Sequence, residues 1–209
     1  DLKRDLAICR SEGVNAVFTP SHGSMYASPY STYVNETLLS RQWEGIQRPS
    51  HFRGVTTIVS KLFLLTQPHV AVFGEKDFQQ AMIIRQMTRD LHFPIRILLE
   101  PTLREKDGLA MSSRNAYLTE NQRGQATVLY QMIQLARKEL RFDPHRKWTS
   151  SRLGSVTQKL LQATPLIRLD YMAFVDPHTL QQAKTIRKGI RMLLAAYAGK
   201  TRLIDNGSL

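Results

Sequence analysis

The hydrophobic and polar positions in the first half of the chain form short apolar runs separated by amphipathic stretches. Apolar runs typical of buried strands occupy residues 15–19, 69–74 and 95–100. Helical spacing of apolar side chains predicts helices over residues 1–12, 55–67 and 75–91. Strand, helix and strand in tight succession indicate an α/β fold with a parallel, doubly wound sheet. Because ligands collect at the carboxyl ends of such strands, the junctions after Thr19, Phe73 and Glu100 are candidate binding positions.

The pattern changes after about residue 103. Thr119 and Gln122 have the spacing of a capping box, which predicts a helix over residues 119–140. A further helix is expected over residues 150–163, and three apolar runs follow at residues 167–175, 190–197 and 201–205. Short turns between those runs predict a small antiparallel sheet. We therefore expect two domains, residues 1–102 and residues 103–209, of which the second is α+β.

The composition narrows the class of partner without fixing it. The net charge of +12 over 209 residues favours anionic partners, either nucleic acid or a small phosphorylated substrate. An RNA-binding protein has only this charge in its favour, because no zinc finger, RRM signature or leucine zipper is present. The six histidines lack metal-ligand spacing. A lone cysteine, Cys9, and the lack of a signal peptide or of a long apolar run predict a cytoplasmic protein that does not enter a membrane.

The stretch FGEKDFQQ (residues 73–80) follows a predicted strand and opens a predicted helix. Gly74 would let the backbone approach a ligand closely, and the helix N-terminus favours phosphate. Lys76 adds a full positive charge, Asp77 could accept hydrogen bonds from ribose hydroxyls, and Gln80 lies one turn beyond Lys76. A plain strand-to-helix turn with solvated charges is the alternative, and the spacing alone favours it.

The stretch DGLAMSSRNAYL (residues 107–118) is the second candidate for anion binding. Arg114 offers a planar fork that matches phosphate oxygens, and Ser112 and Ser113 supply hydroxyl donors. Residues 104–108 read as an exposed and mobile closing loop. The alternative is a helix cap with a surface arginine, in which Asn115 only stabilises the turn.

The roles of residues in two further loops remain open between alternatives. His51 could be a general base, a substrate ligand or an ordinary loop histidine, and the last is the commonest case. Met25 and Tyr26 could line a pocket or pack beneath a loop.

Four blocks stand in the order and spacing found in pantothenate synthetases: EGIQRPSHFRGVTTIVSKLF, QPHVAVFGEKDFQQ, REKDGLAMSSRNAYL and TRLIDN. The chain resembles this family over nearly its whole length. The resemblance implies a Rossmann-like nucleotidyltransferase domain with a parallel sheet that is incomplete at its N-terminal side, followed by a smaller C-terminal lid domain. It implies a homodimer that joins pantoate and β-alanine with ATP through a pantoyl-adenylate. Mg²⁺ would arrive with the nucleotide, and AMP and pyrophosphate would leave.

The resemblance also implies roles for individual residues. Gly74, Glu75, Lys76 and Asp77 correspond to the nucleotide-binding turn, and Gln80 resembles a pantoate ligand. Leu103 resembles a residue on the adenine side. The segment over the ATP phosphates would be formed by Met111, Ser112, Ser113 and Arg114. Lys76, Ser112, Ser113 and Arg114 are the expected catalytic residues, because charge develops on the phosphate oxygens and on the leaving pyrophosphate.

One departure from the family concerns the start of the chain. The family carries a His-x-Gly-His-type motif near its N-terminus, and this sequence has none. The chain opens without methionine inside an amphipathic pattern, so we expect it to be the later part of a longer polypeptide. The alternative function is therefore a truncated, catalytically silent fragment that binds a nucleotide or a partner.

Overall fold

The computed structural model describes residues 1–143 and 145–209 and divides the chain into two compact units, Asp1–Tyr33 and Val34–Leu209. The first unit contains helix α1 (Leu2–Ser11), which Asp1 caps, and the short helix α2 (His22–Met25). Residues 15–19 are exposed and form no strand, so the prediction of a strand there is wrong. A strand needs a neighbour for its backbone groups, and in the described structure this run is paired with none.

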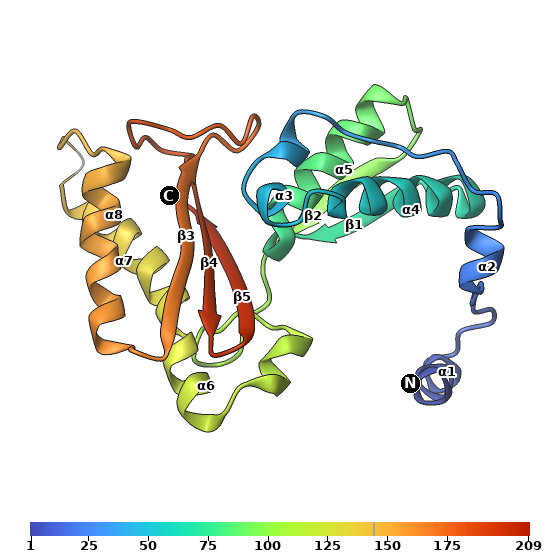
Figure 1. The fold of residues 1–209 in the computed structure, drawn as a ribbon, viewed down its shortest axis with the longest axis horizontal. Helices are drawn as coiled ribbons and strands as arrows, with labels where there is room; N and C mark the ends of the chain where they lie inside the picture. Colours follow the sequence, from blue (N-terminus) through green and yellow to red (C-terminus); the bar gives the residue numbers. More distant parts are fainter. Residues whose placement is uncertain (144) are drawn as a thin grey trace. The chain divides into compact units, whose positions relative to one another are not determined.

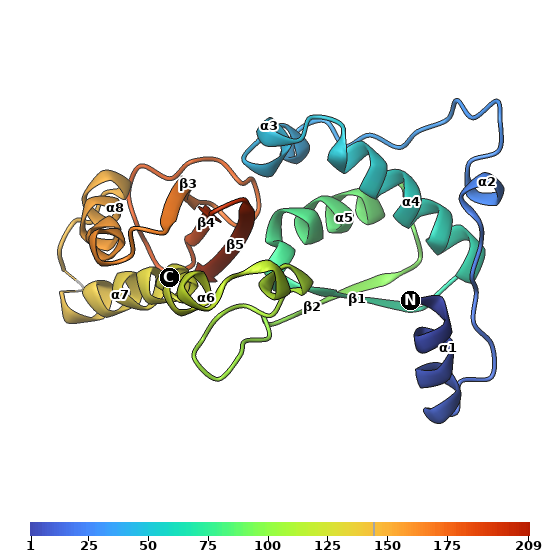
Figure 2. The same ribbon diagram turned by 60° about the horizontal axis from the view of Figure 1, so that its bottom comes forward.

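The first half of the second unit contains the predicted parallel sheet. Strands β1 (Val70–Gly74) and β2 (Arg96–Glu100) pair in parallel, with Val70 opposite Arg96 and Gly74 opposite Glu100. Helices α4 (His51–Thr66) and α5 (Phe78–Asp90) contact each other (Figures 1 and 2). The shorter elements here are η1 (Leu39–Arg41), α3 (Glu44–Gln47) and η2 (Glu75–Asp77).

Two sequence predictions need correction in this half. Helix α5 begins at Phe78 rather than at residue 75, because residues 75–77 form the 3-10 turn η2. Strand β1 is not buried on both faces. Val70 and Val72 are 44% and 59% exposed, whereas Ala71 and Phe73 pack on the core of Phe63, Ile84 and Met87. The alternation reflects a sheet that is covered on one face.

The second half folds as predicted into helices and an antiparallel sheet. Strands β3 (Ile167–Val175), β4 (Arg191–Ala198) and β5 (Thr201–Ser208) stand in the order β3-β4-β5. The helical elements are η3 (Ser113–Tyr117), α6 (Glu120–Ala126), α7 (Val128–Phe142), α8 (Ser150–Gln158) and η4 (Lys159–Ala163). The capping box of Thr119 and Gln122 is present, although the predicted helix is divided at Thr127.

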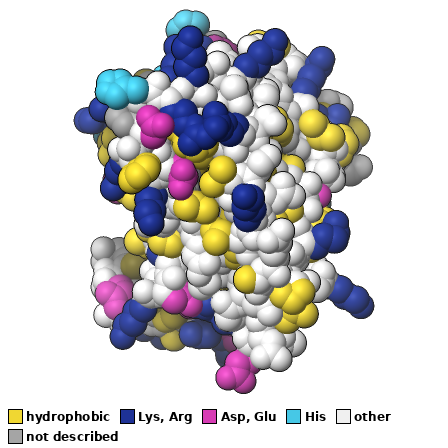
Figure 3. All heavy atoms as spheres, turned by 90° about the vertical axis from the view of Figure 1, so that its left-hand side faces the viewer, with side chains coloured by type: hydrophobic (Ala, Val, Ile, Leu, Met, Phe, Trp, Pro, Cys, Tyr) yellow, Lys and Arg dark blue, Asp and Glu magenta, His cyan; other side chains and the backbone are white. Residues whose placement is uncertain are grey.

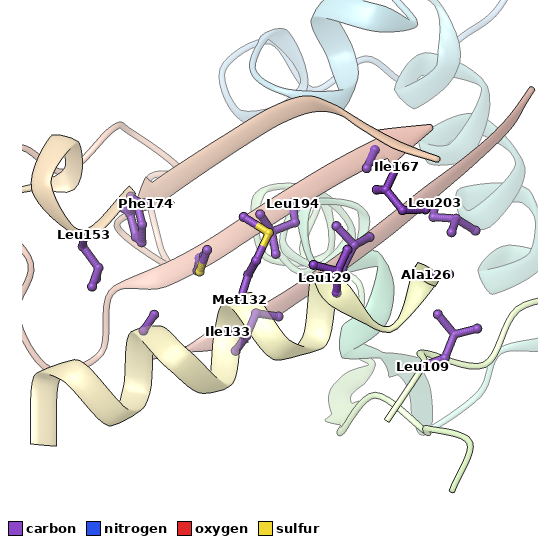
Figure 4. Packing of buried hydrophobic residues seen from close by; sticks show 14 of the residues in the cluster. Leu109, Ala126, Leu129, Met132, Ile133, Leu153, Ile167, Phe174, Leu194 and Leu203 are labelled. Atoms are coloured by element: carbon purple, nitrogen blue, oxygen red, sulfur yellow. The ribbon is translucent and has the colours of Figure 1, made fainter. Parts of the chain in front are cut away.

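Strand β4 is buried on both faces, which explains its continuous apolar sequence. On one face, Leu129, Met132 and Ile133 of α7 pack toward the sheet (Figure 4). On the other face, Leu193 belongs to a cluster with residues of α4, α5 and β3, namely Phe52, Phe78, Met82, Ile83, Ala173 and Val175. The sheet therefore packs against elements from both halves of the second unit, which places its strand ends beside the turn that follows β1.

The surface reflects the basic composition. Figure 3 shows Lys and Arg side chains spread over one face, with Asp and Glu side chains among them. Among the described residues, no helix combines the length and the apolar character that a membrane span requires.

Candidate functional site

A pocket in the second unit is lined by α3, α4, the turn after β1, the segment before α6, and β5. Its polar lining residues are Glu44, Arg48, His51, Lys76, Asp77, Gln79, Gln80, Ser112, Arg114, Asn115, Tyr171, Arg202, Asp205 and Asn206. Apolar side chains, among them Phe52, Phe78 and Leu109, form the remaining wall. Concave sites with apolar walls and a few convergent polar groups are typical of small-molecule binding.

Three cations of the pocket lack an acidic partner in the described part of the chain. Among the described residues, no carboxylate lies within salt-bridge distance of Arg48, Lys76 or Arg114. Positive charges without such partners along one concave surface attract anions and raise their local concentration. The arrangement is suited to a ligand with several negative charges, such as a polyphosphate.

The turn after β1 presents its side chains in two directions. Lys76, Asp77 and Gln80, to which the sequence analysis gave possible ligand contacts, line the pocket. Glu75 instead directs its carboxylate to Arg191 of β4, with an Oε2 to Nη2 distance of 2.7 Å. Gly74, at the end of β1, is not among the lining residues. The structure thus separates the four residues that the sequence grouped into one nucleotide-binding turn.

The segment of residues 104–117 is held at its base by ion pairs. Arg104 binds Asp205 and donates to the carbonyl oxygen of Gly108 at 2.9 Å. Arg123 binds Glu105 at 2.7 Å and Asp107 at 2.6 Å. Hydrogen bonds from Arg123 hold the pKa values of both carboxyl groups below their usual range. The sequence predicted an exposed loop here, and Lys106 and Asp107 are exposed, but Gly108 is buried and the Arg104 side chain is only 18% exposed.

The predicted anion-binding residues of this segment divide into two groups. Ser112 and Arg114 line the pocket, and the guanidinium of Arg114 donates to the carbonyl oxygen of Arg202 at 3.2 Å. Ser113 is exposed, and Met111 and Leu103 are 54% and 75% exposed; none of the three is a lining residue. Of the residues 111–114 that the resemblance assigns to the segment over the ATP phosphates, the structure therefore brings two, Ser112 and Arg114, to the pocket.

Asn115, for which one alternative from the sequence is that it only stabilises the turn, also lines the pocket. Its amide nitrogen donates to Glu105 at 2.8 Å and to the carbonyl oxygen of Ala110 at 3.1 Å. Asn115 thus stabilises the segment, as that interpretation holds, and contributes to the wall of the pocket as well.

An acidic side chain to which the sequence analysis assigned no role connects the two sides of the pocket. Glu44 of α3 accepts hydrogen bonds from both terminal nitrogens of Arg202, at 2.6 and 2.8 Å, and from the Tyr171 hydroxyl at 2.8 Å. Arg202 also binds Asp170. Burial opposes ionisation of Glu44, but the hydrogen bonds from Arg202 and Tyr171 outweigh it and lower the pKa of Glu44. Burial and the adjacent carboxylate raise the pKa of Tyr171.

Gln79 fixes the position of this glutamate. Its amide nitrogen donates to the carbonyl oxygens of Leu39 and Gln42, at 2.8 and 2.7 Å, and its amide oxygen accepts from the backbone N–H of Glu44 at 3.0 Å. Because Gln79 is only 4% exposed, these bonds are protected from competing water. The first turn of α5 therefore holds the α3 segment in place.

His51 lies in the pocket at the start of α4. Its Nε2 atom is 3.3 Å from a terminal nitrogen of Arg48. Burial, followed by the charge of Arg48, lowers the pKa of His51 from its usual value. A neutral imidazole at neutral pH can accept a proton or a hydrogen bond from a substrate. This is compatible with His51 as a general base and with His51 as a substrate ligand.

Sequence reasoning assigned no role to several lining residues. Arg202, Asp205 and Asn206 belong to the block TRLIDN, which carried the resemblance to the family but was given no function. The signal was present in that block. Glu44 opens the block EGIQRPSHFRGVTTIVSKLF, which also carried the resemblance and in which this glutamate was given no function. Tyr171 had no comparable signal, because it is a common residue type within an apolar run. Among the described residues, no group of three or more His, Cys, Asp or Glu side chains is arranged to hold a metal ion.

Comparison with known proteins gives one consistent result. A family model described as pantoate-beta-alanine ligase matches residues 1–208. The pantothenate synthetase of Moorella thermoacetica is 45% identical over 206 residues, which cover 99% of this chain and 72% of that protein. A crystal structure of the Thermus thermophilus enzyme superposes with a TM-score of 0.90 and 42% identity, covering 99% of this chain and 74% of that one.

A more distant solved structure shares the fold. It is the pantoate-beta-alanine ligase of Francisella tularensis, complexed with beta-gamma ATP and beta-alanine. Its TM-score is 0.75 at 31% identity, and the match covers 100% of this chain and 70% of that one. The fold with a short parallel sheet and a C-terminal antiparallel sheet is thus common to this chain and to the solved enzymes.

Proposed function

The chain belongs to the pantoate–β-alanine ligase family, a family of ATP-dependent ligases, and we propose that the pocket described above binds ATP and joins pantoate to β-alanine. The observation that carries this proposal is the convergence on one pocket of Lys76, Arg114 and Arg48, three cations without acidic partners among the described residues. Ser112 and Gln80 supply neutral hydrogen-bonding groups beside them. The Francisella tularensis relative, solved with an ATP compound and β-alanine, supports the choice of ligands.

In the first step, a carboxylate oxygen of pantoate forms a bond to the α-phosphorus of ATP. The bond from that phosphorus to the bridging oxygen of the β-phosphate breaks, and pyrophosphate leaves with the electron pair. The attacking carboxylate is already ionised, so no protein base is needed. Lys76, Arg114 and the Ser112 hydroxyl stabilise the charge that develops on the phosphate oxygens, and catalysis consists mainly of positioning and electrostatics.

In the second step, the amine of β-alanine attacks the acyl carbon of the pantoyl-adenylate, and the bond from that carbon to the AMP oxygen breaks. The nitrogen must lose a proton to leave a neutral amide. His51 is the proton acceptor in this proposal, because it lines the pocket and its pKa is lowered by burial and by Arg48.

Finer assignments rest on the resemblance to the family. In this proposal Gly74, Glu75 and Asp77 complete the nucleotide-binding turn, Leu103 lies on the adenine side, Met111 and Ser113 cover the phosphates, and Gln80 binds pantoate. Mg²⁺ would be held through the ATP phosphates and would neutralise part of their charge, so no dedicated set of protein ligands would be required. The two-domain division at residue 103 and the homodimer belong to the same proposal.

The test is pantoate-dependent exchange of labelled pyrophosphate into ATP. The assay is run on the 209-residue chain and on the same chain extended upstream to the length of its relatives. Exchange in either form supports adenylation at this pocket. ATP binding without exchange in both forms would favour the alternative, a silent nucleotide-binding fragment. An RNA-binding protein would instead show affinity that falls steeply with salt.

A further inference from the structure

Two buried side chains of the C-terminal sheet contact the turn that carries Lys76. The amide nitrogen of Asn206 donates to the carbonyl oxygens of Glu75 and Lys76, at 2.9 and 2.8 Å. Its amide oxygen accepts from the Nε of Arg191 at 2.7 Å. Arg191 in turn binds the Glu75 carboxylate, so β4 and β5 hold the turn by its backbone and by a side chain.

Asn206 and Arg191 are both buried, so the hydrogen bonds that they make to the turn are costly to lose. Asn206 is 4% exposed, and the Arg191 side chain is 8% exposed with its guanidinium 3.9 Å from the centroid of the Phe78 ring. Hydrogen bonds between buried groups are costly to lose, because an unsatisfied donor or acceptor has no water to replace its partner. Asn206 bonds to two backbone carbonyl oxygens of the turn η2, and Arg191 bonds to its Glu75 side chain, so the sheet that faces the turn supports its geometry.

The same strand also holds the opposite wall of the pocket. Successive side chains of a strand point to opposite faces, and on β5 the neighbouring residue Asp205 binds Arg104 at the base of the segment that carries Arg114. Asn206 and Asp205 thus fix the two cation-bearing segments to one rigid element. A shift of either segment relative to the other would change the distance between the charges of Lys76 and Arg114.

We propose that Asn206, oriented by Arg191, is a positioning residue for Lys76 in the adenylation step. This inference rests on the proposed function, because it assumes that the Lys76 charge acts on the phosphates. Asn206 acts through the backbone of the turn, so its contribution requires the lysine side chain. A residue that served only the stability of the fold would contribute to the same degree with or without that side chain.

The test is a double-mutant cycle on pyrophosphate exchange, run in the form of the chain that shows exchange. Asn206→Asp keeps the size of the side chain and its contact with Arg191, but it places an oxygen against two carbonyl oxygens. We expect kcat to fall about 10²-fold, the loss typical of a small misplacement of a reacting group. In a Lys76→Ala background, the same substitution should lower kcat by less than about threefold, since the group that Asn206 positions is gone.

Two further variants serve as controls for this test. Arg191→Lys keeps a positive charge near Glu75 but removes the Nε donor to Asn206, and it should lower kcat about tenfold. In the Lys76→Ala background this substitution should also have little effect on kcat. If Asn206→Asp does not fold, the Arg191→Lys variant replaces it in the cycle. Thr157→Val removes a buried hydroxyl that bonds Leu153, Gly154 and Met172, remote from the turn, and serves as the control for stability. That control should lower the unfolding midpoint without a change in kcat.

The outcomes separate the two levels of the proposal. Equal losses from Asn206→Asp in both backgrounds would overturn the positioning role and leave the proposed function intact. Exchange that is insensitive to Lys76→Ala would overturn this inference and the role of Lys76, but it would leave the adenylation activity in place. Exchange that is absent from both forms of the unmodified protein would overturn the proposed function and this inference with it.

Discussion

Arg104 and Asp205 form a two-pronged ion pair, with nitrogen to oxygen distances of 2.7 and 2.8 Å. The two side chains are 18% and 3% exposed. The guanidinium also lies 4.0 Å from the centroid of the Tyr130 ring, which adds a cation–π contact. The pair joins the start of the 104–117 segment to β5, so the segment that brings Ser112 and Arg114 to the pocket begins from a fixed point.

Removing one partner of this pair should therefore be costly. Asp205→Ala leaves the Arg104 charge buried without its partner, and we expect a loss of about 3–5 kcal/mol in the free energy of unfolding. Urea unfolding followed by circular dichroism measures it. Asp90→Ala is the matched control, because Asp90 pairs with Arg89 on the surface, and its loss should stay below about 1 kcal/mol. Equal losses for the two variants would contradict the buried role of Asp205.

Lys76 is expected to carry the largest single share of charge stabilisation in adenylation. Lys76→Ala should lower the rate of pyrophosphate exchange by about 10²–10³-fold, which is typical of the loss of one transition-state donor. Lys188→Ala, at an exposed position outside the pocket, should leave the rate unchanged. A near-normal rate for Lys76→Ala would mean that the lysine is only a solvated residue of the turn.

Arg114 should require its planar fork as well as its charge. Arg114→Lys keeps the charge but cannot bond two phosphate oxygens at once, so we expect at least about a tenfold loss in kcat/KM for ATP. Steady-state exchange at varied ATP concentration gives this value. Arg187→Lys changes a side chain that is 79% exposed and serves as the control. Full activity of Arg114→Lys would remove the bidentate role.

The sequence predicts structural features that depend on neighbouring residues better than features that depend on residues far apart in the chain. The strand at β1 and the capping box of Thr119 follow from neighbouring residues, and both are confirmed. Residues 15–19 have the composition of a strand but no partner strand in the described structure, a property that no local pattern can encode. Glu44 and Arg202 lie 158 positions apart, so their pairing appears only when the chain is folded.

The candidate site shows the same division. Lys76 and Arg114 were found because their motifs carry local chemistry, and both line the pocket. Asn206 was missed because its contacts are with two carbonyl oxygens 130 and 131 positions away. The block TRLIDN is shared with the family although it contains no recognisable catalytic motif. Such a block indicates residues that position other residues.

The Glu44 network predicts how stability depends on pH. The pKa of Glu44 is lowered from 4.5 in the folded protein, so the unfolded chain binds its proton first as the pH falls. This carboxylate therefore stabilises the fold above about pH 4.5, and that stabilisation is lost as the pH falls through the folded-state pKa. Urea midpoints measured between about pH 3 and pH 6 should fall steeply at the acid end. Glu44→Gln should reduce the slope, and an unchanged slope would show that Glu44 does not contribute.

His51 makes a prediction that separates the two chemical steps. If it accepts the proton of the β-alanine amine, pantothenate formation at saturating β-alanine should rise with pH through an apparent pKa below 6.5, the direction in which burial and Arg48 shift this histidine. His51→Gln should remove that rise and slow amide formation by about 10²-fold, the lower end of the range for a general base. Pyrophosphate exchange needs no proton acceptor and should keep most of its rate in the same variant. An equal loss in both assays would assign His51 to substrate binding, because a residue that binds a shared substrate affects both steps.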